Sequence, residues 1–174
     1  MKTSHLLLTA IAMITGVSLS TAASAATATG SLNAKITITS NCAITGTSTD
    51  LDFGSNASTT ASAVSASNGG FSVTCTNQTP YTIGLKSTAS GAADDGTGTM
   101  KATVNGTAYT IGYQLYQDSG TTVWGNVASG GSANVKSAIG SGTAQAYTVY
   151  GKTTSTLNVP AATYSDTVSI NVEY

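Results

Sequence analysis

The chain has 174 residues, only 7% of them charged, and a formal net charge of −1 at pH 7. Charged residues make up roughly a quarter of an average domain, so Ser, Thr, Asn and Gly must supply this polar surface. The sequence contains no arginine, and its lysines are scattered singly, at Lys2, Lys35, Lys86, Lys101, Lys136 and Lys152. Because nucleic-acid-binding proteins cluster Lys and Arg, this distribution argues against a nucleic-acid partner.

Residues 1–25 have the pattern of a secretory signal peptide. A basic start at Lys2 precedes an apolar run, and Ala23-Ser24-Ala25 offers a small-residue cleavage site. The apolar run, from Leu6 to Leu19, is too short to span a membrane. We therefore expect an exported protein whose mature chain forms one domain.

A front segment, residues 26–39, carries apolar side chains at every second position. The four apolar residues are Leu32, Ala34, Ile36 and Ile38, and polar residues stand between them. A period of two predicts a strand with one apolar face. The pattern alone favours a strand over 30–44 that begins a complete sandwich. However, 30–44 is long for one strand and "TSN" at 39–41 interrupts it, so a detachable front piece is the alternative.

Two cysteines, Cys42 and Cys75, follow the signal peptide. An even number of cysteines in an exported chain predicts a disulfide bond. A thiolate metal site is the alternative, but the single histidine, His5, lies in the signal peptide.

The remaining sequence consists of short alternating runs separated by turn residues, which are typical of β-strands. Asn105-Gly106 between two such runs predicts a type I′ hairpin turn. Residues 134–140 would hold one helical turn at most, and no other helix is expected. We predict an all-β, immunoglobulin-like β-sandwich, with a small barrel as the alternative. Its last strand, Val168–Tyr174, would leave an open edge.

The sequence offers little for catalysis. Without a histidine after residue 25, Ser-His-Asp and Cys-His arrangements are excluded. The turn at 94–98 lacks the alternating acidic ligands of a calcium loop. We expect no enzyme activity, no metal and no cofactor.

Aromatic residues suggest a carbohydrate-binding module as an alternative function. Trp124, Tyr113 and Tyr116 would form a surface on which a sugar ring stacks. However, Tyr113 shares a strand face with Ile111 and Leu115, which predicts a core position.

An ordered set of short motifs along the mature chain resembles the spore coat protein U domain family, which includes pilins of archaic chaperone-usher pili. The motifs are Cys42-Ala43-Ile44, Leu51-Asp52-Phe53-Gly54, Val73-Thr74-Cys75-Thr76, Pro80-Tyr81-Thr82-Ile83, Tyr113 to Asp118, Trp124-Gly125, Tyr150-Gly151-Lys152, and Pro160 followed by Tyr164 to Val168. Ala162 departs from the pattern, because the family favours glycine in the turn before Tyr164.

The resemblance implies a sandwich that lacks its last strand, completed by a donor strand from a neighbouring subunit. Residues 26–39 would be that donor strand and residues 40–174 the pilin domain. Leu32, Ala34, Ile36 and Ile38 would be the plugs that fill the neighbour's groove. The acceptor strand of that groove would present Val168, Ile170, Val172 and Tyr174.

The same resemblance implies partners and location. Identical subunits would form a surface pilus for adhesion and biofilm formation. A periplasmic chaperone and an outer-membrane usher would assemble it, and a tip adhesin would be a further partner. A self-contained secreted coat domain is the alternative.

Overall fold

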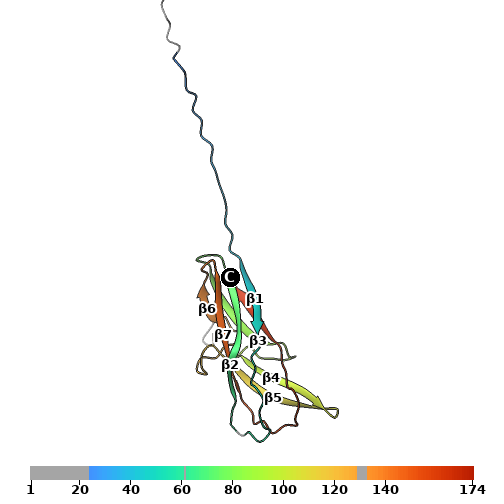
Figure 1. Ribbon diagram of the computed structural model, residues 1–174. Coiled ribbons are helices and arrows are strands. Elements are labelled where there is room, and N and C mark those ends of the chain that lie inside the picture. Colours follow the sequence, from blue (N-terminus) through green and yellow to red (C-terminus); the bar gives the residue numbers. More distant parts are fainter. Residues whose placement is uncertain (1–23, 61, 129–132) are drawn as a thin grey trace, which may run out of the picture. The chain divides into compact units, whose positions relative to one another are not determined.

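The computed structural model describes residues 24–60, 62–128 and 133–174 (Figure 1). Nearly all of the predicted signal peptide therefore lies outside the described residues. The chain divides into two units, Met1–Ile36 and Thr37–Tyr174, and every strand among the described residues belongs to the second. Among the residues described, no helix is long and apolar enough to cross a membrane.

The described part of the second unit is built from eight strands, which form two antiparallel sheets (Figure 1). The strands are β1 (Cys42–Thr49), β2 (Ser65–Cys75), β3 (Pro80–Ser87), β4 (Thr97–Val104), β5 (Thr107–Tyr116), β6 (Lys136–Ile139), β7 (Ala144–Thr153) and β8 (Val168–Glu173). One sheet has the order β1-β2-β7-β5-β4 and the other β6-β3-β8. This arrangement confirms the all-β sandwich prediction, because a closed barrel would have one continuous sheet.

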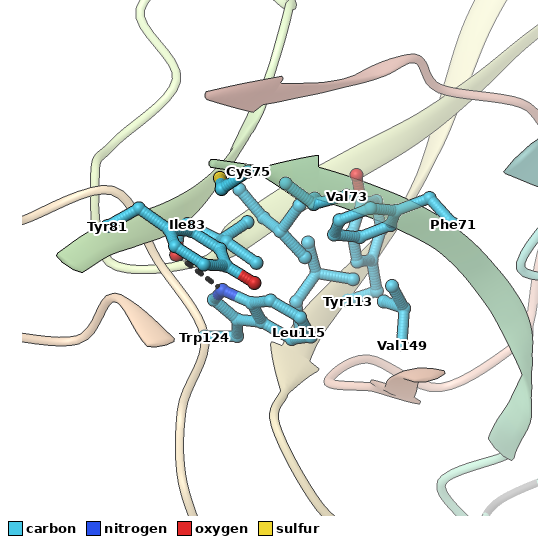
Figure 2. Close-up of a cluster of buried hydrophobic side chains, with 10 residues drawn as sticks. Phe71, Val73, Cys75, Tyr81, Ile83, Tyr113, Leu115, Trp124 and Val149 are labelled. Atoms are coloured by element: carbon cyan, nitrogen blue, oxygen red, sulfur yellow. Dashed lines mark hydrogen bonds between the residues drawn. The ribbon is translucent and has the colours of Figure 1, made fainter. Parts of the chain in front are cut away.

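The core lies between the two sheets and is built from the alternating residues of the central strands (Figure 2). Its buried members include Phe71, Val73 and Cys75 from β2, Tyr81, Ile83 and Leu85 from β3, and Tyr113 and Leu115 from β5. Each strand sends every second side chain inward, so the sequence period places these residues on one face.

Trp124 is fully buried in the middle of this core. Its indole Nε1 donates a hydrogen bond of 2.9 Å to the carbonyl oxygen of Ile83 in β3 (Figure 2). The backbone of the same segment bonds to both sheets, because Trp124 N donates to Leu115 O and Leu85 N donates to Gly125 O. Residues 124 and 125 therefore tie β5 of one sheet to β3 of the other.

Two local predictions are confirmed. Cys42 and Cys75 form a disulfide bond and stand directly opposite each other in the β1–β2 ladder. In the turn between β4 and β5, Asn105 has φ 50° and Gly106 has φ 83°. Positive φ at both central residues is the requirement of a type I′ turn.

Two local predictions are wrong. Residues 136–139, within the segment expected to allow a helical turn, form strand β6 and pair with β3. The edge of β3 supplies hydrogen-bond partners that local sequence does not reveal. The segment 30–44 is not one strand, since β1 begins at Cys42 and residues 24–41 belong to no strand.

The disulfide bond generates a stability prediction. Replacing both cysteines by alanine removes the cross-link without placing a hydroxyl group at the buried position of Cys75. On the loop-entropy model, closing this segment stabilises the fold by about 3 to 4 kcal/mol. We expect the free energy of unfolding to fall by that amount in denaturant titrations. A variant as stable as the native protein would show that the bond contributes nothing to stability.

A groove beside the last strand

Strand β8 lies at the edge of its sheet. One side of β8 pairs with β3, with Ile170 opposite Leu85 and Val172 opposite Ile83. Within the described ranges, no strand pairs with the other side. An unpaired edge presents backbone N–H and C=O groups that a further strand can bond.

A groove of about 510 Å³ runs beside the first half of β8. Its walls come from both sheets. One wall contains Val168 and Ile170 of β8, and the other contains residues 48–53, which include the end of β1 and the segment that follows it. Core side chains form its floor, namely Phe71, Leu85, Leu115 and Val149. The groove therefore opens directly onto the hydrophobic core.

Several side chains on the inner faces of the sheets near this opening are more exposed to solvent than is usual for inner-face positions. Ile44 in β1 stands opposite Val73 in β2, so both side chains point to the inner face. Val73 is 0% exposed, whereas Ile44 is 44% exposed. Val168, Ile170 and Val172 pack against the core but remain only partly buried. One further strand between β1 and β8 would cover these inner-face residues.

The four predicted acceptor residues do not all lie in one cavity. Val168 and Ile170 line the groove, and Val172 packs against the core one step further along β8. Tyr174 follows the end of β8, is exposed, and lines a second hollow of about 590 Å³ with Pro80 and Ile139.

Several groove residues had no role assigned from the sequence. They are Leu51, Phe53, Met100, Tyr164 and Asp166. Leu51, Phe53, Tyr164 and Asp166 belong to the motifs that resemble the family, but their local sequence does not predict that they line a groove. Tyr164 is held there by a hydrogen bond of 2.9 Å from its hydroxyl group to Pro160 O, which spans the turn containing Ala162.

Asp166 connects the start of β8 to both sheets. Its Oδ2 accepts hydrogen bonds of 2.7 Å from Ser87 in β3 and 2.7 Å from Tyr113 in β5. Its Oδ1 accepts a bond of 2.8 Å from the Thr167 N–H group. Gly98 makes room for this contact, because a Cβ atom there would collide with the phenol group of Tyr113.

These hydrogen bonds determine the charge state of the cluster. Burial alone would raise the pKa of Asp166, but the hydrogen bonds from Ser87 and Tyr113 outweigh it and lower that pKa below 3.8. Burial, followed by the hydrogen bond to the Asp166 carboxylate, raises the pKa of Tyr113. Asp166 is therefore a carboxylate and Tyr113 a neutral donor at neutral pH.

The front segment presents its apolar residues to solvent. Leu32 is 89% exposed, Ile36 82% and Ile38 72%, and Ala34 is exposed as well. Exposed apolar side chains at this density are unfavourable in water and typically mark a binding segment. Residues 26–39, all of which the structure describes, are assigned to no strand.

The aromatic residues considered for sugar stacking are mostly inside the protein. Trp124 and Tyr113 are buried in the core, and Tyr116 is partly buried. In the turn at 94–98, the Asp94 carboxylate pairs with Lys86 Nζ at 3.0 Å. Trp124 and Tyr113 are therefore not exposed for stacking on a sugar ring, and the Asp94 carboxylate in the turn is already paired with a lysine.

Comparison with known proteins identifies the family. The Spore Coat Protein U domain matches residues 28–171, so the chain belongs to this family. Among curated protein sequences, no match is found.

The solved structures that match this chain include one with 22% sequence identity and a TM-score of 0.49. It is the CsuC-CsuE chaperone-tip adhesion subunit pre-assembly complex from archaic chaperone-usher Csu pili of Acinetobacter baumannii. The match covers 79% of this chain and 40% of that chain, so it spans less than half the length of the solved chain.

The Asp166 cluster predicts a pH dependence of stability. Because the folded-state pKa of Asp166 is lowered, its carboxylate stabilises the fold above the unfolded-state pKa and loses this effect as pH falls through the folded value. Asp166→Asn should lower the free energy of unfolding by about 1 kcal/mol at pH 7, a small value because the carboxylate is partly exposed.

The difference between Asp166→Asn and the native protein should shrink as the pH falls below 4. Denaturant titrations from pH 7 to pH 3 measure it, with Asp50→Asn at an exposed groove position as the matched control. A difference that stays constant over this range would contradict the assigned role of the carboxylate.

Proposed function

We propose that this protein is a structural pilin subunit that polymerises by strand exchange between copies. The observation that carries the proposal is the open core beside β8, where Ile44, Val168 and Ile170 lack a covering strand. The front segment of a second copy has the pattern such a groove requires, four apolar side chains at period two.

The energetic argument is burial. Filling the groove removes Leu32, Ile36 and Ile38 from water, and full burial of each contributes about 1.5 to 3 kcal/mol. Backbone hydrogen bonds along the free edge of β8 add to this gain. Ordering the front segment opposes it. A donor strand thereby supplies hydrogen-bond partners to the free edge of β8 and at the same time buries its own apolar face.

The geometry of exchange leads to a filament. The front segment and the groove are formed by different residues of the chain, so a contact between the front segment of one copy and the groove of the next is heterologous. Residues 26–39 serve as the donor strand and residues 40–174 as the pilin domain. Repetition of one contact then builds a homopolymeric surface pilus, which we assign to adhesion and biofilm formation.

The open groove also has a consequence before assembly. A subunit with an unfilled core edge aggregates unless another strand protects it. We assign this protection to a periplasmic chaperone and the ordered release of subunits to an outer-membrane usher, with a tip adhesin as a further partner. Cleavage of the signal peptide precedes these steps.

A peptide experiment tests whether the groove accepts a strand. A protein without residues 26–39 should be stabilised by a peptide of residues 29–39, because binding to the folded state raises its stability. At 100-fold excess over Kd we expect a rise in Tm of about 5 to 10 °C. The same peptide with Ile36→Asp is the control. No rise with the native peptide would mean that the sandwich is already complete.

Substitutions in the front segment test its role in the filament. Ile36→Asp places a charge in an apolar groove, which is costly without a partner. This variant should accumulate in the periplasm with its own groove intact but extend few filaments. Lys35→Asp on the opposite strand face is the matched control and should assemble almost normally. Electron microscopy and periplasmic protein levels are the measurements.

Two outcomes would overturn this assignment. If both variants form filaments, the front segment is not the donor strand. If Ile36→Asp removes the soluble subunit even with its chaperone present, the segment belongs to the subunit's own core, and the protein is a self-contained secreted domain.

A further inference from the structure

Given the proposed strand exchange, we propose one particular alignment of donor and acceptor. The front segment of a second copy runs antiparallel to β8, with Ile38 opposite Val168 and Ile36 opposite Ile170. Ala34 then stands opposite Val172, and Leu32 stands opposite Tyr174. This inference rests on the proposed function and adds direction and register to it.

The matching periods of the two segments support this alignment. The inward-facing residues of β8 and Tyr174 are spaced by two, as are the four plugs. Residues directly opposite in an antiparallel pair point to the same face, so all four plugs face the core together. A slip by one residue would turn Lys35 and Thr37 toward the core and expose the plugs.

The position of the groove supports the direction. The 510 Å³ hollow lies beside Val168 and Ile170, at the start of β8. Antiparallel alignment brings the two isoleucines, Ile36 and Ile38, to this hollow. A parallel alignment of the same eight residues would bring Leu32 and Ala34 there instead and leave more of the hollow unfilled.

The other ladders of the domain agree with this direction. All described strand pairs are antiparallel, including β3 with β8 and β1 with β2. Parallel pairing is slightly less stable per residue. An antiparallel donor therefore extends the β6-β3-β8 sheet in its existing pattern.

Slips by two residues keep the plugs inward but lose an apolar pair. In one direction Ser40 would stand opposite Val168 at the apolar hollow. In the other, Ile38 would pass Val168 and stand opposite the Asp166 carboxylate, with Gly30 opposite Tyr174. Each slip either puts a polar side chain against an apolar wall or an apolar side chain against a charge.

The outward face is compatible with the proposed register. Lys35 would stand opposite Asn171, and the adjacent outward residue of β8, Glu173, would be its diagonal neighbour. Diagonal cross-strand neighbours lie about 7 to 8 Å apart, within reach of a long side chain. The proposed register therefore places Lys35 within reach of Glu173, and the plugs determine which register is favoured.

Cysteine cross-linking in assembled filaments tests the alignment directly. The series keeps Thr37→Cys and combines it in turn with Thr167→Cys, Ser169→Cys, Asn171→Cys or Glu173→Cys. All five positions face away from the core, so the plugs stay intact. A disulfide bond requires Cα atoms within about 7 Å, which directly opposed residues satisfy and residues two further along do not.

The expected result is a ladder of covalently linked subunits for the Thr37→Cys and Ser169→Cys pair. Non-reducing electrophoresis shows it, and mass analysis of the digest identifies the linked peptides apart from the native Cys42–Cys75 bond. Each single-cysteine variant, which lacks one partner, is a control and should stay monomeric after denaturation.

Each other outcome has a defined meaning. Cross-linking through Glu173→Cys would support a parallel strand and overturn the proposal. Cross-linking through Thr167→Cys or Asn171→Cys would support a slipped register and also overturn it, as would filaments in which no pair cross-links. If the unsubstituted protein forms no filaments, the proposed function itself fails.

Discussion

The free edge of β8 is the constraint on which the rest of the structure depends. Because β8 pairs with β3 alone among the described strands, the inner faces of the two sheets are not fully closed beside it. Ile44 shows the consequence, since its partner Val73 is completely buried while Ile44 itself remains 44% exposed. A sandwich with this opening keeps an apolar groove in contact with water, a cost that proteins normally avoid unless a partner removes it.

The remainder of the domain holds this groove in a defined shape. The Cys42–Cys75 bond fixes β1 to β2 on one side, and Asp166 fixes the start of β8 to Ser87 and Tyr113 on the other. Between them, Trp124 connects β3 and β5 across the core. Because these bonds connect the two sheets, the walls of the groove are held in place. A partner strand that enters the groove therefore requires little reorganisation of the subunit.

In the proposed assembly, the two unfavourable features of the chain compensate each other. The front segment exposes Leu32, Ile36 and Ile38, and the groove exposes the inner faces of β1 and β8. If a front segment filled the groove of its own copy, the filament could not grow. Insertion into the groove of the next copy buries the front segment and fills that groove, and it leaves another groove free for a further copy. The same burial that stabilises each subunit therefore also drives growth.

The sequence by itself determined the features that depend on local pattern. Alternation at period two identified the central strands and their buried faces, including Tyr113 between Ile111 and Leu115. Positive φ at Asn105 and Gly106 followed from turn chemistry, and the disulfide followed from the cysteine number in a chain expected to be exported. These features are local because each depends on neighbouring residues or on composition.

Only the tertiary structure decided which strand edges remain unpaired and which distant residues meet. Strand β6 forms because it pairs with the edge of β3, and its own sequence, "KSAI", does not predict a strand. Asp166 becomes an anchor because Ser87 and Tyr113 approach it from the two sheets, at sequence separations of 79 and 53 residues. The groove likewise joins residues 48–53 to β8. Such contacts depend on sheet order, and periodicity within a strand carries no information about the strand beside it.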